Sequence, residues 1–137
     1  MRFDTKIAIV VRDDLAAWQR LNVTAFLSSA VAAGEPALIG EPYEDASGNR
    51  YLPMFGQPVL VYVASAEQLA AAHARALTRD DIREAVYIED MFKTGNDADN
   101  RATVADRASD DLPLVGIALH GPRNPIDKIL KGLPLHP

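Results

Sequence analysis

Charged side chains follow two separate strand-like segments of the chain. The first cluster is Arg12, Asp13 and Asp14, and the second contains Glu89, Asp90 and Lys93. In α/β proteins, ligands usually bind where the carboxyl ends of strands meet at one edge of the sheet. This arrangement predicts one site assembled from both clusters.

Two of these acids are candidates for proton-transfer chemistry. Asp14 and Asp90 could form a carboxylate pair, with one acting as a general base and the other as an orienting group. Alternatively, Asp14 caps the helix that follows it, and Asp90 is a solvated loop acid. The residue types leave both interpretations open.

Cations near the same clusters are candidates for holding an anion. Arg12, Arg20 and Lys93 could converge on a phosphate or carboxylate, with backbone N–H groups at the start of the first helix as further donors. The alternative is that these are surface charges paired with nearby acids.

Three other residues are candidate ligand contacts. Trp18, the only tryptophan, either walls a pocket, anchors a partner or is a half-buried core residue. Asn22 is a polar candidate in the same helix. His120, beside Gly121 at the end of an apolar run, either faces the pocket or has a structural role. The histidines lack metal-ligand spacing and the chain has no cysteine, so we predict neither a metal site nor a cofactor.

Apolar runs alternate with helical patterns along the chain. Strands are predicted at 6–11, 58–64, 85–88 and 114–119. Helices are predicted from the Asp14 region to Gly34, at 65–78 with a capping box of Ser65 and Gln68, at 96–108, and from an N-cap at Asn124 to Gly132. The alternation predicts a largely parallel sheet with helices on its faces. Turn residues in 41–55 predict a long surface loop or a loose hairpin.

The bulk composition narrows the class of protein. A length of 137 residues predicts a single domain spanning 1–137. The net charge of −5 argues against extended contact with nucleic acid. Apolar runs are too short to cross a bilayer, and the segment after Met1 lacks the features of a signal peptide. These observations predict a cytoplasmic protein without a membrane partner.

Four motifs, in this order, resemble those of the type II peptidyl-tRNA hydrolases. They are Val11 to Leu15, Gly56 to Pro58, Ile88 to Thr94, and Val115 to Pro122 leading into Ile126 to Lys128. The chain is also similar to a bacterial family of uncharacterised proteins related to those hydrolases, through Trp18 to Thr24, Gly40 to Tyr43 and Lys131 to Leu133. The resemblance implies a three-layer α/β/α domain with a four-stranded mixed, mostly parallel sheet.

The chain departs from the hydrolase pattern at a residue that matters for chemistry. The resemblance places Asp90 and Thr94 at the acidic and hydroxyl positions of a catalytic site, with Lys93 where arginine is usual. Leu21 stands where those hydrolases carry a catalytic lysine, and leucine cannot stabilise a developing oxyanion.

Three functions follow from this comparison. The favoured one is a binding or regulatory module for a small anionic molecule. One alternative is an ester hydrolase in which Lys93 or Arg20 supplies the missing cation, and the other is a homodimeric interaction protein.

Overall fold

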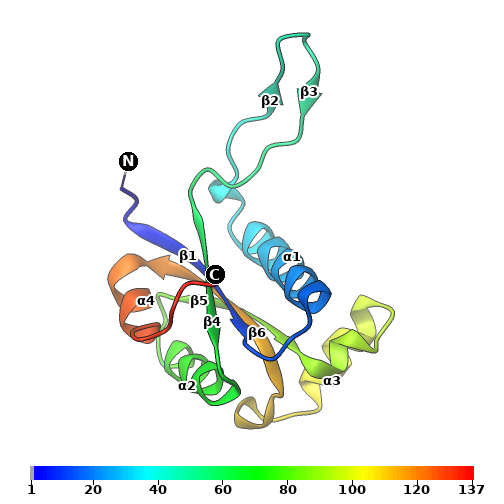
Figure 1. The fold of residues 1–137 in the computed structure, drawn as a ribbon, viewed down its shortest axis with the longest axis vertical. Coiled ribbons are helices and arrows are strands. Elements are labelled where there is room, and N and C mark those ends of the chain that lie inside the picture. The colour runs from blue at the N-terminus through cyan, green and yellow to red at the C-terminus, as the bar shows by residue number, and fades with distance from the viewer. Residues whose placement is uncertain (1) are drawn as a thin grey trace.

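The computed structural model describes residues 2–137, which form a four-stranded sheet with helices on both faces. The strands are β1 (Thr5–Arg12), β4 (Val59–Ala64), β5 (Arg83–Ile88) and β6 (Leu114–Pro122). The helices are α1 (Ala17–Gly34), α2 (Ala66–Leu77), α3 (Asp97–Ala105) and α4 (Arg123–Ile129), with short 3-10 turns η1 (Pro36–Leu38), η2 (Glu89–Phe92) and η3 (Ser109–Asp111). α1 covers one face of the sheet, and α2 and α4 cover the other (Figure 1). The predicted three-layer α/β/α architecture is confirmed.

The sheet is mixed and has the order β4-β1-β6-β5. β1 pairs with β4 in parallel, whereas β6 is antiparallel to both β1 and β5. Three strands therefore point the same way, but only one adjacent pair is parallel because β6 lies between β1 and β5. The carboxyl ends of β1 and β5 share an edge of the sheet with the amino end of β6.

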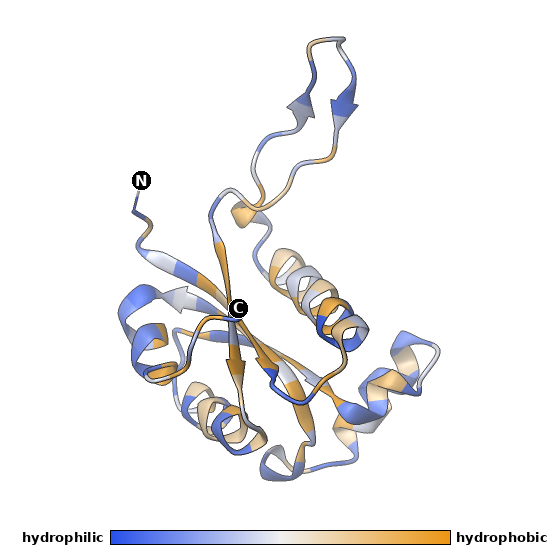
Figure 2. Cartoon of the chain, in the orientation of Figure 1, coloured by the Kyte–Doolittle hydropathy of each residue, from blue (hydrophilic) through white to orange (hydrophobic). Residues whose placement is uncertain are grey.

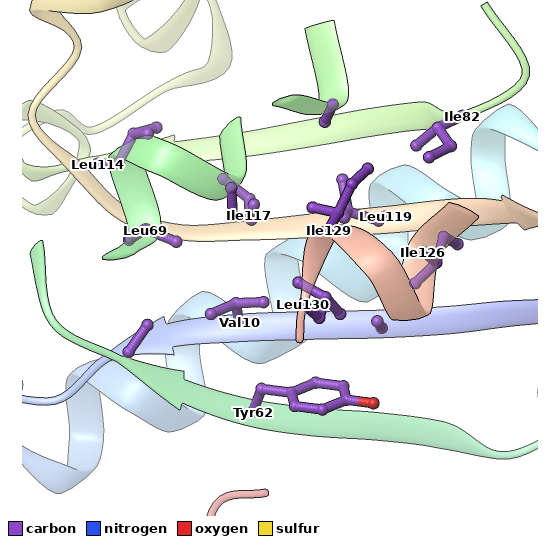
Figure 3. Packing of buried hydrophobic residues seen from close by; sticks show 14 of the residues in the cluster. Val10, Tyr62, Leu69, Ile82, Leu114, Ile117, Leu119, Ile126, Ile129 and Leu130 are labelled. Atoms are coloured by element: carbon purple, nitrogen blue, oxygen red, sulfur yellow. The ribbon is translucent and has the colours of Figure 1, made fainter. Parts of the chain in front are cut away.

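The two apolar faces of the sheet explain why β1 reads as a continuous apolar run. Its side chains alternate between the two core clusters, and Ile7 to Val11 are at most 1% exposed. On the face covered by α2 and α4, Val10, Ile117 and Leu119 pack against Leu69 and Ile126 (Figure 3). Burial on both sides favours the β-branched residues that fill this strand.

Helix starts agree with the prediction in one case and differ in two. α2 begins with the predicted capping box: the Gln68 N–H donates to Ser65 Oγ at 3.1 Å, and Gln68 Oε1 accepts from the Ser65 N–H at 2.9 Å. α1 has Ala16 as its N-cap, so the prediction that Asp14 caps this helix was wrong. The prediction of Asn124 as an N-cap was also wrong, because β6 continues to Pro122 and leads directly into α4.

A two-stranded arm projects from the domain between η1 and β4. It contains β2 (Tyr43–Glu44) and β3 (Arg50–Tyr51), and residues 40–52 are all exposed (Figure 1). A bridge between Ile39 and Phe55 closes its root. The predicted loose hairpin is confirmed; residues 40–54 are called the arm below.

The arm tip is organised by one carboxylate. Asp45 Oδ1 accepts hydrogen bonds from the N–H groups of Ser47 and Asn49 at 2.9 and 3.0 Å. Asp45 Oδ2 accepts from the Tyr51 hydroxyl at 2.7 Å. The hydrogen bond from Tyr51, with those from Asn49, lowers the pKa of Asp45 to about 2.

This geometry predicts that acid loosens the arm and leaves the sheet intact. Because the pKa of Asp45 in the fold lies below its ordinary value of 3.8, its stabilising contribution is present above that value and is lost as the pH falls through about 2. As the pH is lowered, the protection of the amides of residues 45–51 from exchange, measured by NMR relative to the unfolded rate at each pH, should be lost before that of β1. At neutral pH, Asp45→Asn should loosen the same amides. Equal protection of the arm in both proteins would contradict this account.

Candidate functional site at the strand ends

A polar cleft of about 380 Å³ lies where β1 and β5 end. Its walls come from the β1–α1 loop, the first turn of α1 and η2. The lining residues are Arg12, Asp14, Leu15, Gln19, Glu89, Asp90, Phe92 and Lys93. The structure thus brings the two charged clusters together, as the sequence predicted, although they are separated by the end of β6.

Arg12 joins the two clusters across β6. Its Nε donates to Asp14 Oδ1 at 2.6 Å, and its Nη1 lies 2.6 Å from Glu89 Oε1 and 3.2 Å from the Leu114 carbonyl oxygen. Burial alone would lower the pKa of Arg12, but the hydrogen bonds to Asp14 and Glu89 outweigh it and raise that pKa. The hydrogen bond from Arg12 in turn lowers the pKa of Asp14. Arg12 is therefore a charged, fixed bridge.

Several polar atoms of the cleft remain without a protein partner. Within residues 2–137, Asp14 Oδ2 and Glu89 Oε2 accept no hydrogen bond from the side chain of another residue. Lys93 is exposed and forms no ion pair in the same part of the chain. The cleft thus offers two carboxylate acceptors and one ammonium donor to a ligand.

Asp90 and Thr94, the predicted catalytic residues, point to different partners. The Asp90 carboxylate lines the cleft and lies 3.1 and 3.3 Å from Nη2 of Arg107. The Thr94 hydroxyl is within hydrogen-bonding distance of the Met91 carbonyl and the Asn100 side chain, so it ties η2 to α3 and does not line the cleft.

Arg20 does not join the predicted cluster of cations. Its Nε and Nη2 donate to the carbonyl oxygens of Leu15 and Asp13 at 3.0 and 2.9 Å, and its Nη1 lies 3.0 Å from His136 Nε2. The side chain folds back because these loop carbonyls need donors. The predicted convergence of Arg12, Arg20 and Lys93 was wrong with respect to Arg20.

His120 lies at the opposite edge of the sheet from the cleft. It pairs in register with Ile7 of β1 and Arg83 of β5, and it lines a separate cavity of about 90 Å³. Burial lowers the pKa of His120. The expectation that it faces the pocket was wrong, because β6 is antiparallel and its carboxyl end is therefore far from those of β1 and β5.

Trp18 and Asn22 lie beside the cleft and do not line it. The Trp18 ring meets Phe92 edge-on with centroids 5.7 Å apart, and its side chain is 59% exposed. The Asn22 amide donates to the Tyr87 hydroxyl at 3.3 Å, which ties α1 to β5. Trp18 is therefore neither a half-buried core residue nor a wall of the cleft.

The sequence did not predict an apolar groove of about 560 Å³ next to the cleft. The groove lies between α1 and α3, with β5 as its floor. Its apolar walls include Phe26, Tyr87, Met91 and Val104. Phe26 is 53% exposed. The sequence predicts the helix but not which of its faces is exposed, so this groove residue could not be identified from the sequence.

In residues 2–137 there is no group of three or more His, Asp or Glu side chains placed to hold a metal ion. Over the same residues, no helix combines the length and the apolar character needed to cross a membrane.

The comparisons with known proteins identify relatives without a described activity. A family model described as "Protein of unknown function (DUF2000)" matches residues 5–137. The solved structure of the protein of unknown function Atu0240 from Agrobacterium tumefaciens strain C58 has a TM-score of 0.95 and 49% sequence identity, covering 99% of this chain and 100% of that chain. A search of curated proteins finds no match.

Proposed function

The chain belongs to the DUF2000 family, whose description assigns no activity, and from its strand-end cleft we propose that it is a binding module for a small zwitterionic molecule. The observation that carries this proposal is the pairing of unused groups in one cleft. Lys93 is available for an anionic group, while Asp14 and Glu89 each keep one oxygen for a cationic group.

The charge balance of the cleft favours a zwitterion over a simple anion. Arg12 is occupied by two carboxylates, so Lys93 is the remaining cation among the lining residues. A purely anionic ligand would lie close to the carboxylates of Asp14 and Glu89, and like charges at such distances repel. The anionic group expected from the sequence is therefore retained and combined with an ammonium group.

Size and shape also fit a small molecule. A volume of about 380 Å³ lies in the lower part of the range of ligand pockets. Phe92 supplies an aromatic wall that is supported edge-on by Trp18. An aromatic amino acid, which has an ammonium, a carboxylate and a ring, matches these three features.

We do not propose ester hydrolysis, because the charged groups that it needs are engaged or absent. Leu21, at the position of the hydrolase lysine, is 73% exposed on α1. Asp90 is paired with Arg107, and the Thr94 hydroxyl is bound within its own turn and to α3. Lys93, the lining cation that forms no ion pair within residues 2–137, has a long flexible side chain that is not preorganised to stabilise a developing oxyanion.

Calorimetric titration with three matched ligands tests the proposal. Phenylalanine should bind more tightly than phenethylamine, which lacks the carboxylate, and than phenylpropionate, which lacks the amino group. Loss of one charge-assisted contact should weaken binding by roughly tenfold or more. Lys93→Gln should abolish the advantage of phenylalanine over phenethylamine, and Asp14→Asn should reduce its advantage over phenylpropionate.

Lys131→Gln is a matched control, because Lys131 is an exposed lysine that does not line the cleft. This variant should bind like the wild type. Stronger binding of phenylpropionate than of phenylalanine would contradict the zwitterion and favour a purely anionic ligand. Absence of binding by all three probes would exclude the aromatic amino acid class and, with it, the proposal.

A further inference from the structure

The outer surface of α1 lacks the charges that an exposed helix normally carries. Its exposed positions are Ala17, Trp18, Leu21, Ala25, Phe26, Ser29, Ala30 and Ala33. The only charged residue of the helix, Arg20, is bound to the preceding loop. Figure 2 shows pale and orange ribbon along most of α1. An exposed apolar patch of this kind usually marks an interaction surface.

The arm also carries apolar side chains that no other part of the described chain covers. Tyr43, Tyr51, Leu52 and Met54 are between 47% and 86% exposed, with Leu52 at the upper limit. A two-stranded ribbon is marginally stable by itself in water. These four apolar side chains, which lie beside the exposed charges of Glu41, Glu44 and Arg50, would be covered by an apolar partner surface.

Together these surfaces have the area of a stable interface. Trp18, Leu21 and Phe26 on α1 and the four apolar side chains of the arm are each about half exposed or more. With on the order of 200 Å² of surface for each large side chain, they present roughly 800 Å² per chain, which is about the area that each partner contributes to a standard interface.

From these observations we infer that two copies of the chain form a twofold dimer through the outer face of α1 and the arm. A twofold axis brings the same patch of both chains together, so one apolar face can cover the other. The small residues Ala25 and Ser29 at the centre of the face allow two helices to approach closely. Each chain carries a net charge of −5, and like charges repel. The outer face of α1, which carries no unpaired charge, is therefore the part of the surface on which two copies can meet with little electrostatic repulsion.

Antiparallel packing of the two α1 helices also provides a place for the arm. The arm leaves the domain just after the carboxyl end of α1 (Figure 1). In an antiparallel pair, that end lies beside the amino end of the partner's α1, where Trp18 is exposed. The apolar side chains of the arm thus cover the Trp18 end of the other copy.

Sedimentation velocity of the full chain and of charge-substituted variants tests the inference. The wild type should have twice the chain mass of 14.9 kDa. Leu21→Glu places a charge at the most exposed large apolar side chain of the α1 face and should weaken the dimer by roughly 100-fold or more, because the interface would bury a charge without a partner. Leu21 is 73% exposed, so the fold of each chain should be unchanged by circular dichroism.

Leu77→Glu is the matched control, since Leu77 is 55% exposed at the end of α2, outside the proposed interface. This variant should remain a dimer. A third variant, in which an Asn-Gly turn replaces residues 42–52, keeps the root closed through the 2.8 Å hydrogen bond from the Gly40 N–H to the Met54 carbonyl. It should also dissociate more readily than the wild type.

Fluorescence of Trp18, the only tryptophan, provides a second readout. Its emission should shift to longer wavelength when the dimer is diluted or when Leu21→Glu is introduced. A wild type that is monomeric at every concentration would overturn the inference. So would a Leu21→Glu protein that dimerises like Leu77→Glu, because the contact would then lie elsewhere, for example at the groove beside β5.

Discussion

Replacing His73 with alanine is expected to destabilise the fold by roughly 3 kcal/mol, because it leaves a buried carboxylate without its partner. His73 Nδ1 lies 2.7 Å from Glu84 Oε2, and the two side chains are only 7% and 11% exposed. The pair connects α2 to β5 across the α2 side of the sheet. Burial raises the pKa of Glu84, and the hydrogen bond with His73 offsets part of this effect.

The control for this prediction removes both polar groups. In a protein with His73→Leu and Glu84→Met, apolar groups fill the same space and no ion is left buried. Its stability should lie within about 1 kcal/mol of the wild type. Urea denaturation at neutral pH measures both differences. A double variant as unstable as His73→Ala would show that the packing of His73, and not its pairing, supports the fold.

The pH dependence supplies an independent check with a defined sign. A carboxyl group whose pKa is raised in the fold contributes stability that is present below its ordinary value of 4.5 and is lost as the pH rises through the raised pKa. His73→Ala removes the hydrogen bond that lowers this pKa and keeps the burial that raises it. The deficit of His73→Ala should therefore shrink at a pH below 4.5, where Glu84 is neutral. A deficit independent of pH would contradict the pairing.

The layers of the fold could be predicted from the sequence because local patterns decide them. The apolar run in β1 and the capping box at Ser65 are both local signals, and both are present in the structure. The direction of β6 is not local. α3 and η3 precede β6 and lie at the end of β5, so the chain re-enters the sheet antiparallel between β1 and β5.

This single reversal also explains the largest error in the candidate site. His120 follows an apolar strand, as Asp14 and Glu89 do, but its strand runs the other way. The convergence of the β1 and β5 ends did not depend on β6, so the cleft itself could be predicted. Its charge balance could not, since the sequence does not reveal that Arg12 binds two acids or that Arg20 turns to loop carbonyls.

The apolar outer face of α1 shows a different limit of sequence reasoning. Val23, Leu27 and Val31 form the buried stripe of α1, whereas Ala30, which has the same helical spacing, is exposed. Nothing in the pattern distinguishes the side facing the sheet from the uncovered side, because both are apolar. Only the position of the sheet shows that Trp18, Leu21 and Phe26 are each more than half exposed.

Gly116→Ala is expected to cost roughly 2 kcal/mol of stability, because α1 packs directly on the backbone of β6 at this glycine. A Cβ atom at position 116 would lie 2.6 Å from Val23 Cγ1, 3.1 Å from Leu27 Cδ1 and 3.2 Å from the Val10 carbonyl oxygen. Valine in a helix has one strongly preferred rotamer, so Val23 cannot turn aside without strain. The helix must instead move away from the sheet and weaken its contacts along β1 and β5.

The consequences of Gly116→Ala should extend to both proposed surfaces, since α1 carries Gln19 of the cleft and Leu21 of the interface. Gly95→Ala is the matched control, because a Cβ there meets nothing within 4 Å and should change stability by no more than about 0.5 kcal/mol. Thermal melts of both proteins, combined with sedimentation, separate the two effects. If Gly116→Ala and the wild type have the same melting temperature, α1 can accommodate a methyl group at position 116. The close contact with β6 would then not fix the position of α1, nor those of Gln19 and Leu21.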